Sequence, residues 1–326
     1  MATNSEAVVP ELDEESPRMT ARAWLQLFRL PNVFTAMADI FLGYLLVHDA
    51  LEPWWTFALL LVASCLLYTS GMVLNDVFDF AVDRQQRPAR PLPSGRIPLG
   101  LALHTGGVML GAGVALGWSV SALEGNARSG IVATTLAVAV LAYDRVLKRT
   151  PIAPLVMGSC RTLNILLGAS TAAGPWHTIH YVVAAGLGVY ITGVTWFART
   201  EARVSNRMSL GLASVVMAAG LALVAYFPSM IDDALPVGWA PRYALEIGER
   251  WYVLWGLLAL LILRRPVAAI AEPIPKRVQL AVKECILSLV VIDAVACYAV
   301  RGVPWAIVIL LLLLPTLFLG RWIYST

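Results

Sequence analysis

Ten apolar stretches, each close to the length of a membrane-crossing helix, constrain the fold of this chain more than any other feature. A helix needs about 20 apolar residues to span the hydrocarbon core of a bilayer. Charged residues make up only 14% of the 326 residues, against about 25% in a soluble globular domain, and mean hydropathy is +0.72. The sequence therefore predicts an all-α, multi-span transmembrane helical bundle. The expected spans are residues 23–48, 53–79, 98–121, 128–146, 152–173, 178–198, 207–228, 250–265, 277–300 and 303–323.

The chain divides into a short tail and one membrane domain. Residues 1–22 are acidic and polar, unlike the basic start of a cleavable signal, and we expect a disordered cytoplasmic tail. Residues 23–326 are predicted to form a single transmembrane domain. The net charge of +3 gives no indication of nucleic-acid binding, and no nucleic-acid partner is expected. The four cysteines show no metal-ligand spacing and are expected to be buried packing residues.

Basic residues are concentrated in the connections that follow the even-numbered spans. Connections after the odd-numbered spans carry few basic residues. The positive-inside rule therefore predicts that the connections after the even-numbered spans face the cytoplasm, together with both termini. The longest connection, roughly 228–249, would then lie on the outer side, with an irregular course set by its prolines. The cytoplasmic set comprises Arg84, Arg87, Arg90, Arg96, Arg145, Lys148, Arg149, Arg199, Arg203, Arg207, Arg264, Arg265, Lys276 and Arg277.

A polar motif closes the second predicted span. Asn75, Asp79 and Asp83 are four residues apart, so on a helix they would share one face. Three oxygen-bearing side chains at the mouth of a membrane helix suit a hard divalent cation such as Mg²⁺. The alternative is a solvated helix end, but carboxylates at membrane depth are costly and usually functional. Asp76 lies about 100° around the helix from Asn75 and is a candidate partner of the site.

An arginine-rich loop follows this motif, and Arg87 and Arg90 are expected to contact phosphate. Simple membrane anchoring would explain the charge, but it does not explain the proline and glycine framework that stiffens residues 88–95. Lys148 and Arg149 end the fourth span, where they either complement the helix dipole or also face the phosphate. A metal beside arginines at a membrane boundary suggests a lipid diphosphate substrate, with the site facing the cytoplasm.

Other polar residues within the spans leave structural and functional roles open. Arg161 and Asn164 lie three residues apart in the fifth span, and an intramembrane arginine needs a partner, for which Asp144 or Glu201 are candidates. A purely structural clasp and direct ligand contact are both consistent with this pair. In the first span, Asn32 is expected to face a cavity within the bundle. Arg29 is expected to be a membrane anchor. Asp39 is expected either to pair helices or to line the site. Glu201 is expected to contribute to the site rather than only to a salt-bridged helix end.

The motif Asn75-Asp76-x-x-Asp79-x-x-x-Asp83, with the following Arg87-Pro88-x-Arg90-Pro91-x-x-Ser94-Gly95, resembles the first signature of the UbiA superfamily of intramembrane prenyltransferases. The resemblance covers about residues 24–300. The sequence Ala198-Arg199-Thr200-Glu201 is similar to the EboC-like branch. Supporting elements are Arg29-x-Pro31-Asn32, the segment from Tyr143 to Arg149, and Asn164 with Gly168.

This resemblance implies a bundle of usually nine helices around a central cavity, and Mg²⁺-dependent transfer of an isoprenyl group from an isoprenyl diphosphate. The acceptor, aromatic or another small molecule, is unidentified, and membrane lipid surrounds the site. By analogy, Asn75, Asp79 and Asp83 would be catalytic and hold Mg²⁺. Arg87 and Arg90, with Lys148 and Arg149, would bind the diphosphate. Candidate site-lining residues are Asn32, Tyr143, Arg161, Asn164, Arg199 and Glu201.

Two departures from the family pattern keep other functions open. The family usually has a second aspartate-rich motif after the sixth span, but no aspartate lies between residues 145 and 231 here, and Glu201 is the acid in that segment. A second metal would then be absent or held differently, with Arg199 as a possible substitute charge. The span 303–323 is an addition to the usual nine. A transporter component and a non-catalytic relative that binds lipid diphosphate are the alternatives to an enzyme.

Overall fold

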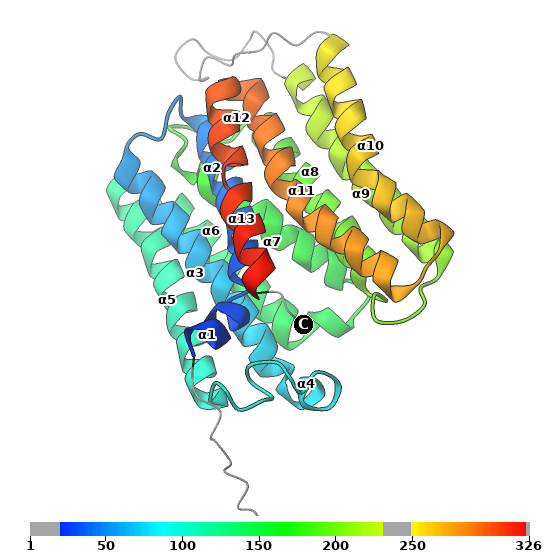
Figure 1. Cartoon of the computed structure of the whole chain (residues 1–326). Coiled ribbons are helices and arrows are strands. Elements are labelled where there is room, and N and C mark those ends of the chain that lie inside the picture. The colour runs from blue at the N-terminus through cyan, green and yellow to red at the C-terminus, as the bar shows by residue number, and fades with distance from the viewer. Residues whose placement is uncertain (1–19, 231–248, 324–326) are drawn as a thin grey trace, which may run out of the picture.

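The computed structural model describes residues 20–230 and 249–323, and within them every regular element is a helix. The predicted tail, apart from its last residues, and most of the predicted 228–249 connection lie outside the described residues. The helices are α1 (Ala21–Leu27), α2 (Leu30–Val47), α3 (Trp54–Phe78), α4 (Phe80–Gln86), α5 (Leu99–Glu124), α6 (Arg128–Arg145), α7 (Ala153–Gly168), α8 (Thr178–Ala198), α9 (Arg207–Tyr226), α10 (Glu249–Ala271), α11 (Pro275–Arg301), α12 (Val303–Leu310) and α13 (Leu313–Ile323) (Figure 1).

The predicted helical membrane bundle is confirmed, and each of the ten expected spans is found as helix. Seven helical segments of the described chain are long and apolar enough to cross a membrane, so this is an integral membrane protein. The helix count differs slightly from nine or ten, because the first and last expected spans are each split and the short α4 follows the second span. The seven segments are Leu30–Val47, Trp54–Phe78, Leu99–Glu124, Thr178–Ala198, Arg207–Met230, Arg250–Ala271 and Val303–Ile323.

The first expected span breaks at Arg29, which has the left-handed backbone conformation with φ 46° and ψ 45°. This conformation is unfavourable for a residue with a Cβ atom and ends α1. Pro31 then lies in the first turn of α2, where the missing N–H has no intrahelical partner to lose. The break turns α1 away from α2 and places it at the end of the bundle that holds the predicted motif (Figure 1).

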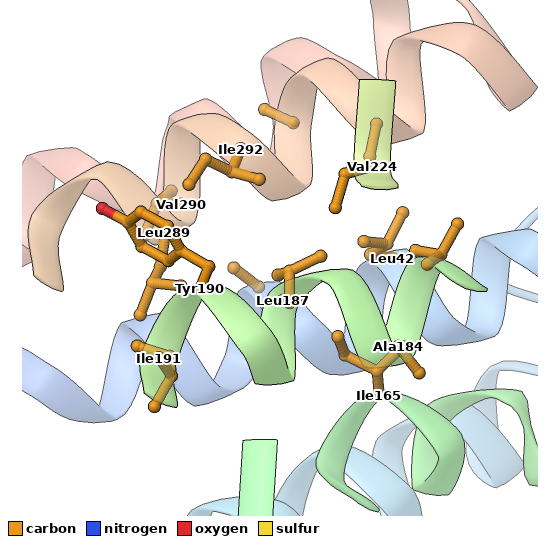
Figure 2. Packing of buried hydrophobic residues seen from close by; sticks show 14 of the residues in the cluster. Leu42, Ile165, Ala184, Leu187, Tyr190, Ile191, Val224, Leu289, Val290 and Ile292 are labelled. Carbon is orange, nitrogen blue, oxygen red and sulfur yellow. The ribbon is translucent and has the colours of Figure 1, made fainter. Parts of the chain in front are cut away.

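Helix α8 packs in the centre of the bundle. Its Leu187, Tyr190 and Ile191 are buried between α2 and α11 (Figure 2). The Tyr190 hydroxyl donates to the Cys285 carbonyl oxygen at 3.0 Å, which satisfies the polar end of a fully buried ring. The four cysteines are free and buried or half-buried, as the sequence predicts.

Helices α2 and α7 approach each other at a pair of glycines. A Cβ atom on Gly168 would lie 2.7 Å from the carbonyl oxygen of Ile40, and one on Gly43 would meet the carbonyl oxygen of Ile165. Small residues at such a crossing let the two backbones come close, as is typical of packed membrane helices. This contact fixes the position of the polar residues that α2 and α7 carry.

The four basic connections meet at one end of the bundle. Lys148 contacts Asp79, joining the connection after α6 to that after α3. Arg199 Nη1 donates to the Pro151 carbonyl oxygen at 3.4 Å. The connections after α8 and α10 are joined by the Ser205 amide, which donates to the Pro273 carbonyl oxygen at 3.0 Å. The structure therefore gathers the predicted cytoplasmic connections on one face.

Candidate active site

The motif does not lie on one continuous helix. Helix α3 ends at Phe78, and Asp79 (φ −88°, ψ 0°) separates it from the short α4, which carries Asp83. Asn75 and Asp79 remain together, because both reach the ammonium of Lys148. Lys148 Nζ lies 2.6 Å from Asp79 Oδ1 and donates to Asn75 Oδ1 at 3.3 Å. Two of the three side chains of the motif therefore each have an oxygen in contact with the Lys148 ammonium.

Asp83 belongs to a second, neighbouring group of charges. Its Oδ2 accepts from Arg90 Nη1 at 2.6 Å, and the same nitrogen lies 3.4 Å from Asp76 Oδ1. Asp76 also accepts from Arg29 at 3.0 Å. Arg29 was expected to be a membrane anchor, but it is paired with the buried Asp76 across α2 and α3. Asp76 thus has the predicted supporting place beside the motif.

The oxygen-bearing side chains of the motif suit a hard cation that takes only some of its ligands from the protein. No group of three or more His, Cys, Asp or Glu side chains in residues 20–230 and 249–323 is arranged to hold a metal ion. Mg²⁺ needs no such cage, since it usually binds one or two carboxylates together with water and phosphate oxygens. The convergence of Asn75 and Asp79 on the charged Lys148 shows that their oxygens can share one cation. These residues therefore fit Mg²⁺ as part of an incomplete coordination shell.

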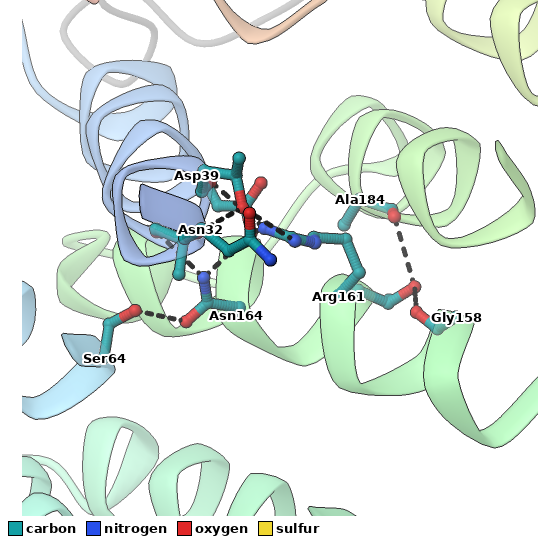
Figure 3. Close-up of polar contacts among 10 residues, drawn as sticks. Asn32, Asp39, Ser64, Gly158, Arg161, Asn164 and Ala184 are labelled. Atoms are coloured by element: carbon teal, nitrogen blue, oxygen red, sulfur yellow. Dashed lines mark hydrogen bonds and ion pairs between the residues drawn. The ribbon is translucent and has the colours of Figure 1, made fainter. Parts of the chain in front are cut away.

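A buried polar clasp joins α2 to α7 (Figure 3). Arg161 Nη1 lies 2.5 Å from Asp39 Oδ2, and Asn164 Nδ2 donates to the same oxygen at 2.8 Å. Ser64 donates to Asn164 Oδ1 at 2.7 Å, and Arg161 also donates to the carbonyl of Thr35 at 3.1 Å. The partner of Arg161 is therefore Asp39, and the expectation of Asp144 or Glu201 is wrong. The sequence contained the signal, because Asp39 is the acid within the first span.

Tyr143, Arg161 and Asn164 line a small pocket of about 90 Å³, together with Asp144. Asn32, at the start of α2, lines a different and much larger cavity, as does Arg90. The candidate lining residues are thus divided between two hollows rather than gathered in one.

The remaining candidates lie in the connections after α4, α6 and α8 and line neither of these two cavities. Arg87, Arg149 and Arg199 are exposed. Glu201 is half-buried in the turn after α8, where its carbonyl oxygen accepts from Gln279 of α11 at 3.3 Å. Burial raises the pKa of the Glu201 carboxyl, and the charges of Arg87 and Arg29 partly offset this.

The large cavity has a volume of about 940 Å³ and lies between α1, the start of α2, the arginine-rich loop, α11 and α13. Its wall includes charged residues that sequence reasoning did not assign to a site. One signal was available, since Lys283 is a charged residue inside an expected span and such residues usually face a cavity. The unassigned polar residues are Arg22, Gln26, Arg96, Gln279, Lys283 and Arg321.

Curated relatives match part of the chain. It is 35% identical over 156 residues to the digeranylgeranylglyceryl phosphate synthase of Metallosphaera sedula, covering 47% of this chain and 53% of that protein. It is 38% identical over 96 residues to the synthase of the same name from Sulfolobus acidocaldarius, covering 29% and 34%. The matches therefore span about half or less of these relatives.

Solved structures share the fold over most of the chain. A structure of digeranylgeranylglyceryl phosphate synthase superposes with a TM-score of 0.59 at 18% identity, covering 86% of this chain and 99% of that one. A UbiA homologue from Archaeoglobus fulgidus bound to GPP and Mg²⁺ gives 0.59 at 14% identity, covering 86% and 100%. The UbiA prenyltransferase family pattern matches residues 36–280. The chain belongs to the UbiA prenyltransferase family.

Proposed function

We propose that this protein transfers an isoprenyl group from an isoprenyl diphosphate to an acceptor within the membrane, with Mg²⁺ as the metal. The observation that carries the proposal is the shared contact of Asn75 and Asp79 with Lys148, beside the Asp83–Arg90 pair. Cations and carboxylates alternate there at the membrane edge, which is the arrangement that a diphosphate with its metal requires. Mg²⁺-bound structures of UbiA homologues with DMAPP or GPP support the assignment.

Asn75, Asp79 and Asp83 would hold Mg²⁺, which supplies Lewis-acid stabilisation of the departing diphosphate. Lys148 and Arg90 would bind the diphosphate oxygens, and the exposed Arg87 and Arg149 would add positive charge. The C–O bond to the diphosphate breaks with its electron pair on oxygen, and the acceptor forms a new bond to the allylic carbon and releases a proton. Preorganised cations stabilise the charge that develops on the leaving group.

The names of the relatives favour a glyceryl phosphate lipid as the acceptor rather than an aromatic one. The EboC-like assignment and the single-domain boundary at residue 23 remain predictions. We also propose that the site faces the cytoplasm, because the basic connections meet at its end of the bundle. Among the candidate lining residues, Tyr143, Arg161 and Asn164 line the small pocket, and Arg199 and Glu201 lie at the end of α8 and in the turn after it.

The test is product formation by the purified protein in lipid nanodiscs. The protein is incubated with Mg²⁺, dimethylallyl, geranyl or geranylgeranyl diphosphate, and a panel of glyceryl phosphate and aromatic acceptors, and products are identified by mass spectrometry. Removing Mg²⁺ with EDTA should stop transfer. Asp79→Asn and Asp83→Asn should each lower the rate about 100-fold or more, the usual effect of removing one group that stabilises a transition state.

The control is Glu52→Gln, an exposed carboxylate in the connection between α2 and α3, which should leave the rate unchanged. Wild-type rates in the Asp79 and Asp83 variants would refute the assignment of the metal site. Binding of the diphosphate without any product would support the non-catalytic alternative. Movement of a lipid diphosphate across the membrane without product would support a transporter component.

A further inference from the structure

Among the described residues, the lining of the large cavity beside the motif carries more positive than negative charge. Six cationic side chains of residues 20–230 and 249–323 line it, and they come from α1, the start of α2, the arginine-rich loop, α11 and α13. Asp76 is the acid in the same lining, and it is paired with Arg29 and Arg90. The cations are Arg22, Arg29, Arg90, Arg96, Lys283 and Arg321.

Three of these cations have no carboxylate partner within the described part of the chain. Arg96 donates to three neutral acceptors, namely Ser94 Oγ at 3.0 Å, Gln26 Oε1 at 3.0 Å and the Ala89 carbonyl at 2.6 Å. A guanidinium has five N–H donors, so two remain available. Lys283 and Arg321 form no ion pair among residues 20–230 and 249–323.

Part of the cavity wall is apolar, beside the neutral polar side chains of Gln26, Asn32, Gln279 and Thr316. Val282, Ile286 and Leu287 of α11 and Leu317 of α13 line it beside the cations. A small hydrophilic anion would leave this apolar wall without a partner. A ligand with an anionic head and an apolar chain would contact both parts of the wall.

Helix α13 forms one wall of this cavity. It follows residue 280, where the family match ends. It packs against α2 and reaches α1 (Figure 1). Gln26 Nε2 donates to the Ile323 carbonyl at 3.5 Å, and Gln26 Oε1 accepts from Arg96 Nη1 at 3.0 Å, so the end of α13 is linked to the arginine-rich loop. Arg321 is thereby held on the same cavity as Arg96.

We propose that Arg96, Lys283 and Arg321 bind the phosphate monoester head of the lipid acceptor, with its chain against α11 and α13. This rests on the proposed function and adds a second anion site beside the diphosphate site at Asp79 and Lys148. Arginine binds phosphate oxygens in pairs, and lysine adds a point charge. The helix that supplies Arg321 therefore sets the selectivity for an anionic acceptor.

The test compares two lipids that differ in the phosphate. Binding of 1-oleoylglycerol 3-phosphate and of the uncharged 1-oleoylglycerol to the full-length protein in nanodiscs is measured by microscale thermophoresis. Wild-type protein should prefer the phosphate lipid. The double variant Lys283→Gln, Arg321→Gln should bind it at least about tenfold more weakly, because hydrogen bonds to charged groups contribute substantially. Its affinity for the uncharged lipid should not change.

The control is Lys276→Gln, an exposed lysine on α11 that does not line the cavity. Unchanged phosphate-lipid binding in the double variant would overturn the proposal, as would weaker binding of geranyl diphosphate with Mg²⁺, since the cavity would then serve the donor. Asp79→Asn should show the reverse pattern, with donor binding lost and phosphate-lipid binding retained. If Asp79→Asn retains donor binding, the proposed function fails separately from the acceptor site.

Discussion

Removing the negative charge of Asp39 should destabilise the bundle more than any surface substitution. Asp39 is fully buried, and the Arg161 side chain is only 10% exposed. In Asp39→Asn the shape is kept, but Arg161 loses its closest carboxylate and keeps its hydrogen bonds to the neutral oxygens of Thr35. Breaking a buried ion pair by removing one partner costs about 3–5 kcal/mol. We expect a value near the lower end, because Asp293 of α11 is close enough to interact with Arg161.

A double-mutant cycle separates this pair from general damage to the core. Arg161→Met keeps the length of the side chain and removes its charge. The double variant Asp39→Asn, Arg161→Met removes both members of the pair together, so its loss of stability should be about 2–3 kcal/mol smaller than the sum of the single losses. The free energy of unfolding is measured in lipid bicelles by titration with sodium dodecyl sulfate, followed by circular dichroism.

An exposed ion pair of the same length is the control. Arg277 and Glu272 are also 2.5 Å apart, but both are about half exposed. Glu272→Gln should cost less than about 1 kcal/mol, since water screens the pair. Additivity of the Asp39 and Arg161 substitutions within about 0.5 kcal/mol would refute the argument, because uncoupled residues behave that way.

Two further predictions concern helix packing and pH. Gly43→Ala should destabilise the protein markedly in the same unfolding assay, because its Cβ would meet the carbonyl oxygen of Ile165, whereas Gly107→Ala on α5, with open space around it, should be tolerated. Burial raises the pKa of Glu201 above 4.5, so the folded state keeps a proton that the unfolded state releases, and stability should fall as pH rises from 4.5 through the folded pKa. Glu201→Gln should remove this fall in thermal unfolding measured across that range, and an unchanged pH profile would contradict the reasoning.

Local sequence patterns predicted the helices and the place of the motif. The apolar stretches are each long enough for a span, and that length requirement is a property of the bilayer rather than of distant contacts. The breaks were not predictable in the same way. Arg29 adopts a left-handed conformation and Asp79 interrupts α3, and neither position has the glycine or proline that usually marks such a break.

Contacts between distant segments could not be predicted from the sequence either. Asp39 and Arg161 are 122 residues apart, and the sequence shows that an intramembrane arginine needs a partner without showing which acid faces it. The large cavity depends on a contact between segments still farther apart in the sequence, since Arg22 donates to the carbonyl oxygen of Trp322, 300 residues later. Only the folded bundle places α1 against α13, so no local pattern could identify Arg321 as part of the site wall.

The pairing of charges at the motif explains how the protein can keep three carboxylates at the membrane edge. Asp79 is balanced by Lys148, Asp83 by Arg90 and Asp76 by Arg29. Carboxylates with little exposure are costly unless each has a counter-ion.

The same cations suit phosphate oxygens, so one set of side chains meets both needs. Three nearby cations have no part in these pairs. Arg96, Lys283 and Arg321 are not used by any of the three carboxylates, although they line a neighbouring cavity with an apolar wall. Stabilising the motif does not require them, and their place on the cavity is accounted for by a second anion.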